Sequence, residues 1–347
     1  MIRRRSPAPA SLVSNGRFAF GVFDGPIRRV NPLDAARPFS LPLPRAVHAW
    51  RLKEWQAFQL AGDRFFVLLA LFDAKMLALA QAKVYDRETG RKYLFERKLP
   101  PWKLRIASGL GRSETRYRAG GLEMAFHNRL DHGRIEIDLH LPAEGAFPGL
   151  SGSVVARTSG YDPLVVALPF ARNRGMYSHK GPASLEGELR LGEETIRFDP
   201  AVSQLLIDDH KGYYPREMKW DWVTAAGRDS AGRRVAFNLT RNQAIDPGRY
   251  NENCVWVNGR AHLLPPVRFE REGCKAGDRW TIQDEQGRVD VRFEVEVEGR
   301  VDIRALVLRS DYDGPFGTFR GGLADDDGNS ICIDGLFGMG ERFCLSL

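Results

Sequence analysis

The sequence predicts an all-β protein that folds as two antiparallel β barrels or sandwiches in tandem, with few short helices. Three observations lead to this prediction. Apolar and polar residues alternate with period two over long stretches, turn residues recur at short spacing, and signals for helices are scarce. The chain has 347 residues, more than one average domain, and two domains are therefore expected.

The clearest alternation covers residues 289–297, where apolar residues alternate with charged ones before Gly299 and a second alternating run at 301–307. This pattern predicts a long antiparallel hairpin with one buried and one solvated face. Shorter runs of the same kind occupy residues 135–141, 185–191 and 235–239. Turn sequences predict further hairpins at residues 86–90, 118–121, 257–259, 284–287 and 325–329.

Two segments carry a helical signal. Residues 65–83 are rich in Ala and Leu and fit a helix, although the run from Arg64 to Phe72 fits a fully buried strand equally well. A short helix is expected from Ala201 to Leu206, because Asp199 can cap it and Pro200 suits a first turn. Prolines before residue 44 indicate an extended arm over residues 1–40. A joint near residues 198–206 then divides domains at 41–200 and 201–347.

Composition limits the class of protein. Hydrophobic residues make up 43 % and charged residues 27 %, which is ordinary for a globular chain. No window approaches 18 uncharged apolar residues, so no transmembrane segment is expected, and the N-terminus lacks the apolar core of a secretory signal. A cytoplasmic location follows as the expectation. The four cysteines are widely spaced, and buried free thiols are expected in preference to a disulfide.

Charge is distributed unevenly. Residues 1–130 contain 24 Lys or Arg against 10 Asp or Glu, whereas residues 131–347 contain 27 against 34. A basic half can attract an anionic partner such as nucleic acid, lipid headgroups or an acidic substrate. The cations are scattered and no basic motif interleaved with aromatic residues occurs, so we expect a solvated surface and no specific nucleic acid.

The densest group of polar and aromatic residues lies at 208–222. Trp220 and Trp222 share one face of a strand and can line a pocket. A carboxyl group beside an apolar wall has a raised pKa and can donate a proton near neutral pH. Candidate catalytic residues are therefore Asp208, Asp209 and His210, and candidate ligand-binding residues here are Lys211, Tyr213, Tyr214, Trp220 and Trp222. The alternative is that these are loop acids and core tryptophans.

Other candidate ligand-binding residues lie at a distance in the sequence: His179, Lys180, Asn238 and Glu341. His179 can exchange protons near neutral pH, or it is an ordinary loop histidine. Glu341 lies on a final strand, where it can cap a barrel mouth or pair with an Arg. Nucleotide-binding, nucleophile-elbow and zinc-protease motifs are absent, and no cofactor or metal is expected.

Several strings resemble an uncharacterised bacterial family known only as a domain of unknown function, of the DUF2804 type. They are Leu185-Glu-Gly-Glu188, Phe198-Asp-Pro200, residues 208–212 with Pro215, Trp220-x-Trp222, Gly335 to Glu341 and Lys53-Glu-Trp55. More distantly, the layout is similar to tandem lipocalin-like proteins that include carotenoid 1,2-hydratases and certain fungal Diels-Alderases. That resemblance implies two barrels and an apolar small molecule bound in or between them.

These observations lead to one main hypothesis and two alternatives. The main hypothesis is a lipocalin-like protein that binds an apolar small molecule and acts on it as a cofactor-independent hydratase, cyclase or isomerase. In that case Asp208 or Asp209 protonates the substrate, and aromatic faces stabilise the cation. The first alternative is a non-catalytic carrier or sensor, and the second is binding of an anionic surface by residues 1–130. The sequence leaves the oligomeric state open.

Overall fold

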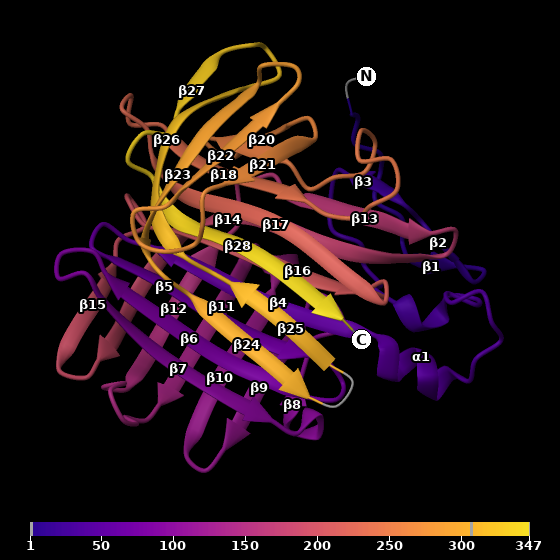
Figure 1. The fold of residues 1–347 in the computed structure, drawn as a ribbon. Coiled ribbons are helices and arrows are strands. Elements are labelled where there is room, and N and C mark those ends of the chain that lie inside the picture. Colours follow the sequence, from indigo (N-terminus) through magenta and orange to yellow (C-terminus); the bar gives the residue numbers. More distant parts are fainter. Residues whose placement is uncertain (1–2, 306–307, 347) are drawn as a thin grey trace.

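The computed structural model describes residues 3–305 and 308–346, and nearly all of its regular structure is β-strand. Figure 1 shows two units, one made by the indigo to rose strands and the other by the orange to yellow strands. The first unit is a nearly closed barrel and the second is half a barrel. The prediction of an all-β chain with two tandem β units is confirmed.

The first sheet has 14 strands in the described part of the chain, and its main path runs β7-β6-β5-β4-β16-β14-β12-β11-β10-β9-β8. Strand β14 is long enough to pair with β13 near its start and with β12 near its end. The strands are β3 (Gly21–Phe23), β4 (Lys53–Ala61), β5 (Phe65–Asp73), β6 (Ala78–Asp86), β7 (Arg91–Leu99), β8 (Leu104–Arg105), β9 (Ser113–Ala119), β10 (Leu122–Arg129), β11 (Arg134–Leu141), β12 (Leu150–Arg157), β13 (Leu164–Ala171), β14 (Arg174–Leu191), β15 (Glu194–Phe198) and β16 (Gln204–Gly212).

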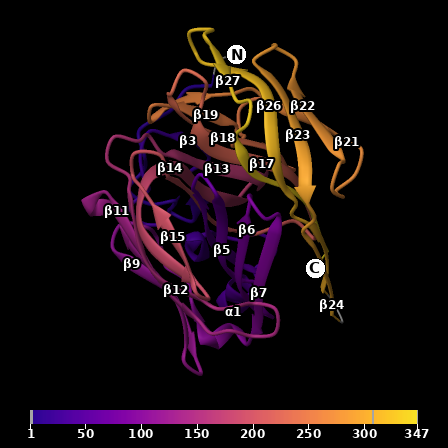
Figure 2. The same ribbon diagram turned by 90° about the vertical axis from the view of Figure 1, so that its left-hand side faces the viewer.

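The second sheet has 12 strands in the described part, with the main path β20-β19-β18-β17-β28-β26-β23-β22-β21. The strands are β17 (Glu217–Arg228), β18 (Arg234–Arg241), β19 (Cys254–Val257), β20 (Arg260–Leu263), β21 (Val267–Arg271), β22 (Arg279–Asp284), β23 (Val289–Val297), β24 (Arg300–Ala305), β25 (Leu308–Asp313), β26 (Phe316–Ala324), β27 (Ser330–Cys332) and β28 (Phe337–Ser346). Figure 2 shows β24 extending from the second sheet to the level of β7. Lys92 of β7 donates a hydrogen bond to the carbonyl of Glu298, which lies between β23 and β24.

Helices are short and lie in connections between strands. They are η1 (Pro32–Asp34), α1 (Arg45–Arg51), η2 (Pro101–Lys103) and η3 (Leu130–His132). Strands β1 (Val13–Ser14) and β2 (Arg17–Phe18) form a small separate ribbon. No helix in the described ranges is long and apolar enough to cross a membrane. None of the four cysteines forms a disulfide, but only Cys254 is buried, whereas burial of all four was expected.

Period two places apolar side chains in two separate cores, one inside each unit. The predicted alternation at 289–297 is confirmed, since Val289, Val291, Phe293 and Val295 are buried. Hairpins form at all five predicted turns. The stretch 65–83, which the sequence left open, contains strands β5 and β6.

Two predictions about local structure are wrong. Strand β23 pairs with β22 and β26 and not with residues 301–305, because β24 forms its own hairpin with β25. The rest of the predicted run, Leu306 and Val307, lies outside the described residues. No helix forms at 201–206. The carboxylate of Asp199 accepts a hydrogen bond from the backbone N–H of Ala201 within a turn, and β16 then begins at Gln204.

The passage from one unit to the other lies at residues 213–216. Strand β16, which the sequence analysis assigned to the second domain, pairs with β4 and β14 of the first sheet. The N-terminal segment, expected as an arm over residues 1–40, packs on β13 through β3 and reaches the second unit through Arg3. The guanidinium of Arg3 donates hydrogen bonds to the carbonyl oxygens of Asn251, Asn253 and Leu264.

Candidate functional site

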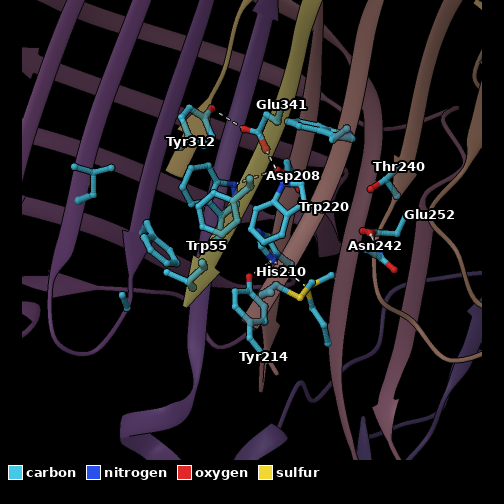
Figure 3. Close-up of a pocket in the computed structure, with 18 of the residues that line it drawn as sticks. Trp55, Asp208, His210, Tyr214, Trp220, Thr240, Asn242, Glu252, Tyr312 and Glu341 are labelled. Carbon is cyan, nitrogen blue, oxygen red and sulfur yellow. Dashed lines mark hydrogen bonds between the residues drawn. The ribbon is translucent and has the colours of Figure 1, made fainter. Parts of the chain in front are cut away.

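A cavity of about 110 Å³ lies between the two units. One wall comes from β4, β5, β6, β14 and β16 of the first sheet, and the other from β17, β18, β25 and β28 of the second. Figure 3 shows side chains from both walls pointing toward one another across this space. The lining is mostly apolar, so the cavity suits an apolar molecule with a few polar contacts.

Aromatic side chains form much of the cavity wall. Trp220 and Trp222 both line it, as their separation by two positions in strand β17 predicted. Trp220 stacks on Phe343 with ring centroids 4.0 Å apart, and Trp55 contacts Phe72 edge to face at 5.5 Å. Their π faces are suited to holding a flat apolar group or a developing cation.

Asp208 and Lys180 form a buried ion pair on the first wall. They are direct cross-strand partners on β16 and β14, and Lys180 Nζ lies 2.5 Å from Asp208 Oδ1. The indole N–H of Trp55 donates to Asp208 Oδ2 at 3.1 Å. Lys180 Nζ also lies 3.9 Å from Glu252 Oε1 and 4.8 Å from the ring centroid of Trp222.

This pairing gives Asp208 a pKa shift opposite to the one expected from the sequence. Burial by itself raises the pKa of the Asp208 carboxyl group, but Lys180, His210 and the indole N–H of Trp55 together outweigh burial, and the net pKa lies below its usual value. Asp208 is therefore a carboxylate at neutral pH. It can stabilise a nearby cation, but it is poorly suited to donate a proton.

Glu341 has the opposite properties. It lies on β28 directly across from Trp222 of β17. The indole N–H of Trp220 donates to Glu341 Oε2 at 3.0 Å, and the hydroxyl group of Tyr312 donates to Oε1 at 2.7 Å. Burial raises the pKa of Glu341 despite these bonds, and the negative charge of Asp208 raises it further. Glu341 is thus one acid of this cavity that is suited to carry a proton.

Glu252 is a second buried acid in the lining. Burial raises the pKa of Glu252, while the ammonium group of Lys180 opposes this effect. Its carboxylate also accepts a hydrogen bond from the side-chain amide of Asn242 at 3.1 Å. The single ammonium group of Lys180 thus lies between Asp208 and Glu252, and these two acids differ in pKa direction.

His210 contributes a neutral imidazole. Burial lowers the pKa of His210 to about 4, so the ring is uncharged at neutral pH. Nδ1 lies 2.8 Å from the hydroxyl group of Tyr214, which can therefore donate to it. Tyr214 and His210 both line the cavity, and their rings stack at a centroid distance of 6.2 Å.

Five candidate residues do not line the cavity. Asp209 and Lys211 alternate with Asp208 and His210 along β16, so they lie on the other face, where Lys211 Nζ is 2.9 Å from Asp209 Oδ1. Burial raises the pKa of Asp209 and lowers that of His179 to about 4. Tyr213 lies beneath the N-terminal arm and donates to the carbonyl of Pro32.

The fifth residue, Asn238, lies behind the wall. It accepts a hydrogen bond from the indole N–H of Trp222 at 2.6 Å and donates one to the carbonyl of Glu252 at 2.6 Å. Asn238 thereby fixes the orientation of a wall tryptophan, although it does not reach the cavity itself.

Sequence reasoning missed Glu252 and Tyr312 as lining residues and gave Trp55 no role in the site. Trp55 was quoted only as part of Lys53-Glu-Trp55, one of the segments that resemble the family. Glu252 and Tyr312 lie in short polar segments without any motif. They reach the cavity because the two sheets face each other, and no local spacing encodes that arrangement. Among the residues described, no group of three His, Cys, Asp or Glu is placed to hold a metal ion.

Comparisons with known proteins identify similar folds and the family of this chain. No curated protein sequence matched. Among solved structures, CghA with Sch210972 matches with a TM-score of 0.55 at 14 % identity, covering 85 % of this chain and 88 % of that chain. Kievitone hydratase from Nectria haematococca matches with a TM-score of 0.50 at 13 % identity, covering 92 % and 95 %.

At such identities the structural likeness establishes a shared fold, and it confirms the distant resemblance inferred from the sequence. A family model, domain of unknown function (DUF2804), matches residues 4–345. That match covers nearly the whole chain and includes both walls of the cavity. The chain belongs to the family described as domain of unknown function (DUF2804).

Proposed function

We propose that this protein binds an apolar small molecule in the cavity between its two sheets and transfers a proton to it without a bound cofactor. The observation that carries the proposal is a mostly apolar cavity in which the pKa of one buried acid, Glu341, is raised while the pKa of another, Asp208, is lowered. Two carboxyl groups whose environments separate their pKa values are a common arrangement for acid–base catalysis.

In the proposed reaction Glu341 protonates a carbon–carbon double bond of the ligand. The resulting carbocation lies against Trp220 and Trp222, and the carboxylate of Asp208 opposes its charge. In a hydration, water then supplies the hydroxyl group and its released proton returns to the Glu341 carboxylate. In an isomerisation or cyclisation, the carbocation loses a proton from another carbon instead, and that proton returns to the Glu341 carboxylate. The three reactions therefore share the protonation step and differ only in the final step.

The names of two structural neighbours agree with this class. One neighbour is a hydratase, and another was solved with the small molecule Sch210972. Since identity is 13–14 %, these names support the type of chemistry and do not identify the substrate.

A non-catalytic carrier or sensor is the alternative function, and one observation favours it. Both oxygens of Glu341 already accept hydrogen bonds from fixed donors, Trp220 and Tyr312. A carboxyl group held in this way can serve to order the wall around a ligand that leaves unchanged. The proposed enzyme and the carrier therefore share a binding site and differ in the fate of the ligand.

Incubation of the protein with an organic extract of its own host in D₂O distinguishes the two functions. We expect a small molecule in the extract to gain deuterium on carbon, because the exchangeable proton of Glu341 is a deuteron in that solvent. A hydration adds the elements of D₂O, and an isomerisation adds one deuterium in place of hydrogen. Untargeted mass spectrometry before and after incubation measures both changes.

A sample without protein and a heat-denatured sample are the controls for spontaneous exchange. The carrier function predicts instead that a compound co-purifies with the protein and is recovered without deuterium. Recovery of such a compound, with no molecule of the extract labelled, would exclude the proposed catalysis.

A further inference from the structure

Two tryptophans at one end of the first barrel are exposed to solvent. Trp102 of η2 is 81 % exposed and Trp50 of α1 is 45 % exposed. Leu41, in the segment before α1, is 59 % exposed. Large apolar side chains exposed near one another commonly mark a surface that binds a partner.

The strand register shows that both tryptophans lie next to the same end of the adjacent strands β4 to β7. Glu54 of β4 pairs with Asp73 of β5, whose partner in β6 is Ala78, and Ala78 pairs in turn with Leu99 of β7. Helix α1 directly precedes this end of β4, and η2 directly follows this end of β7. Three strand spacings separate these ends, a distance of about 14 Å.

The same edge borders the cavity. The turn between β5 and β6 lies between the two tryptophan-bearing segments, and it contributes Ala74 and Leu77 to the cavity lining. A molecule bound at this edge would therefore lie next to one margin of the cavity.

The two flanking segments are basic. Residues 45–53 and 98–105 together contain six Lys or Arg and no Asp or Glu. Four of these cations, Arg45, Lys98, Lys103 and Arg105, are exposed. Acids from outside the segments approach two of them, since Arg45 lies 3.4 Å from Asp34 and Arg105 lies 3.9 Å from Glu114.

We infer that this edge of the barrel docks on the surface of an anionic lipid bilayer, with Trp50 and Trp102 in the headgroup region and the basic residues near lipid phosphates. Tryptophan prefers the membrane interface, and Lys and Arg near an anionic leaflet add electrostatic attraction. The exposed indoles favour a bilayer over nucleic acid, because a phosphate backbone needs cations but no apolar insertion. This inference goes beyond the proposed function and does not depend on it.

Co-sedimentation with lipid vesicles tests the inference. We expect the full chain to bind vesicles of phosphatidylcholine and phosphatidylglycerol in equal amounts and to bind phosphatidylcholine vesicles weakly. Trp102→Ala should weaken binding to the anionic vesicles about tenfold or more, because a buried indole contributes a large apolar area. Replacing Lys98 and Lys103 together by Gln should weaken it about 25-fold, since each cation near the surface contributes a factor of about five.

Leu94→Ala is the matched control, because Leu94 is an exposed apolar residue, 47 % exposed, on β7, the strand that leads into η2, and it lies five residues before the end of that strand. It should bind the anionic vesicles like the wild type. Absence of wild-type binding, or an equal effect of Leu94→Ala and Trp102→Ala, would overturn the inference. Binding to a DNA duplex in place of vesicles, unaffected by Trp102→Ala, would also overturn it and indicate a nucleic-acid surface.

One further measurement separates this inference from the proposed function. The neutral fluorescent probe 1-aminoanthracene reports on the apolar cavity, and Trp102 does not line that cavity. Trp102→Ala should therefore bind the probe like the wild type while losing vesicle binding. If it loses probe binding as well, the two sites are not separate and the inference fails.

Discussion

Replacing Lys180 by Met is expected to lower the free energy of unfolding at neutral pH by about 3–5 kcal/mol. The substitution keeps a long side chain over Trp222 but removes the ammonium group next to Asp208. It thus leaves a buried carboxylate without its cation, and uncompensated buried charge is strongly destabilising. Urea unfolding followed by circular dichroism measures the change.

A second variant tests whether the charge is the cause. Adding Asp208→Asn to Lys180→Met removes the unpaired carboxylate, so the double variant should be more stable than the single one. The exposed pair of Arg197 and Glu188, at 2.9 Å, is the matched control, and Arg197→Met should cost less than about 1 kcal/mol. A loss of similar size for both single variants would contradict the account of the buried pair.

Replacing Glu341 by Gln is expected to slow the proposed proton transfer by a factor of about 10²–10⁴. Glutamine has nearly the same size and keeps one oxygen that can accept from Trp220 or Tyr312, but its amide cannot donate a proton to carbon. Because the variant preserves the aromatic walls, ligand binding should remain. The rate of deuterium incorporation into the labelled compound, compared between variant and wild type, is the measurement.

Glu193→Gln provides the matched control, since Glu193 is exposed on the turn between β14 and β15. It should leave the rate unchanged. If Glu341→Gln turns over the compound as fast as this control, Glu341 is not the acid, and Glu252 becomes the remaining buried carboxyl group with a raised pKa in the cavity lining.

Much of the fold could be predicted because its signals are local. Alternation and turn residues depend on neighbours within a few positions, and they located strands such as β11, β18 and β23 and the turns that join several hairpins. The pairing of β23 with β26 could not be predicted this way. Which strand pairs with β23 depends on how distant segments of the chain pack. Residues 300–305 have the alternating pattern that a partner strand of β23 needs, yet they do not pair with it.

The candidate site was predicted only in part, because local patterns can be read from the sequence and the packing of distant strands cannot. Period two grouped Trp220 with Trp222, but the sequence analysis kept Asp208 and Asp209 as equal candidates, although they lie on opposite faces of β16 and only Asp208 lines the cavity. The direction of the pKa shift at Asp208 depends on Lys180, which is 28 positions away and reaches it only across paired strands. Glu252 and Tyr312 required the packing of the two units as well.

The proposed function depends most on Glu341 carrying a proton inside the cavity. Since its pKa is raised above the usual 4.5, the folded protein binds more protons than the unfolded chain between these two values. The resulting stabilisation is fully present below pH 4.5 and is lost as the pH rises through the folded-state pKa. Glu341→Gln should remove this part of the pH dependence of stability.

Carbon-13 NMR of protein labelled at the glutamate Cδ positions measures that protonation directly, with Glu341→Gln used to assign the resonance. We expect the Glu341 resonance to titrate at a pH clearly above 4.5, the usual pKa of a glutamate side chain. Titration of Glu341 at or below 4.5 would contradict the proposed role of Glu341 as the proton donor.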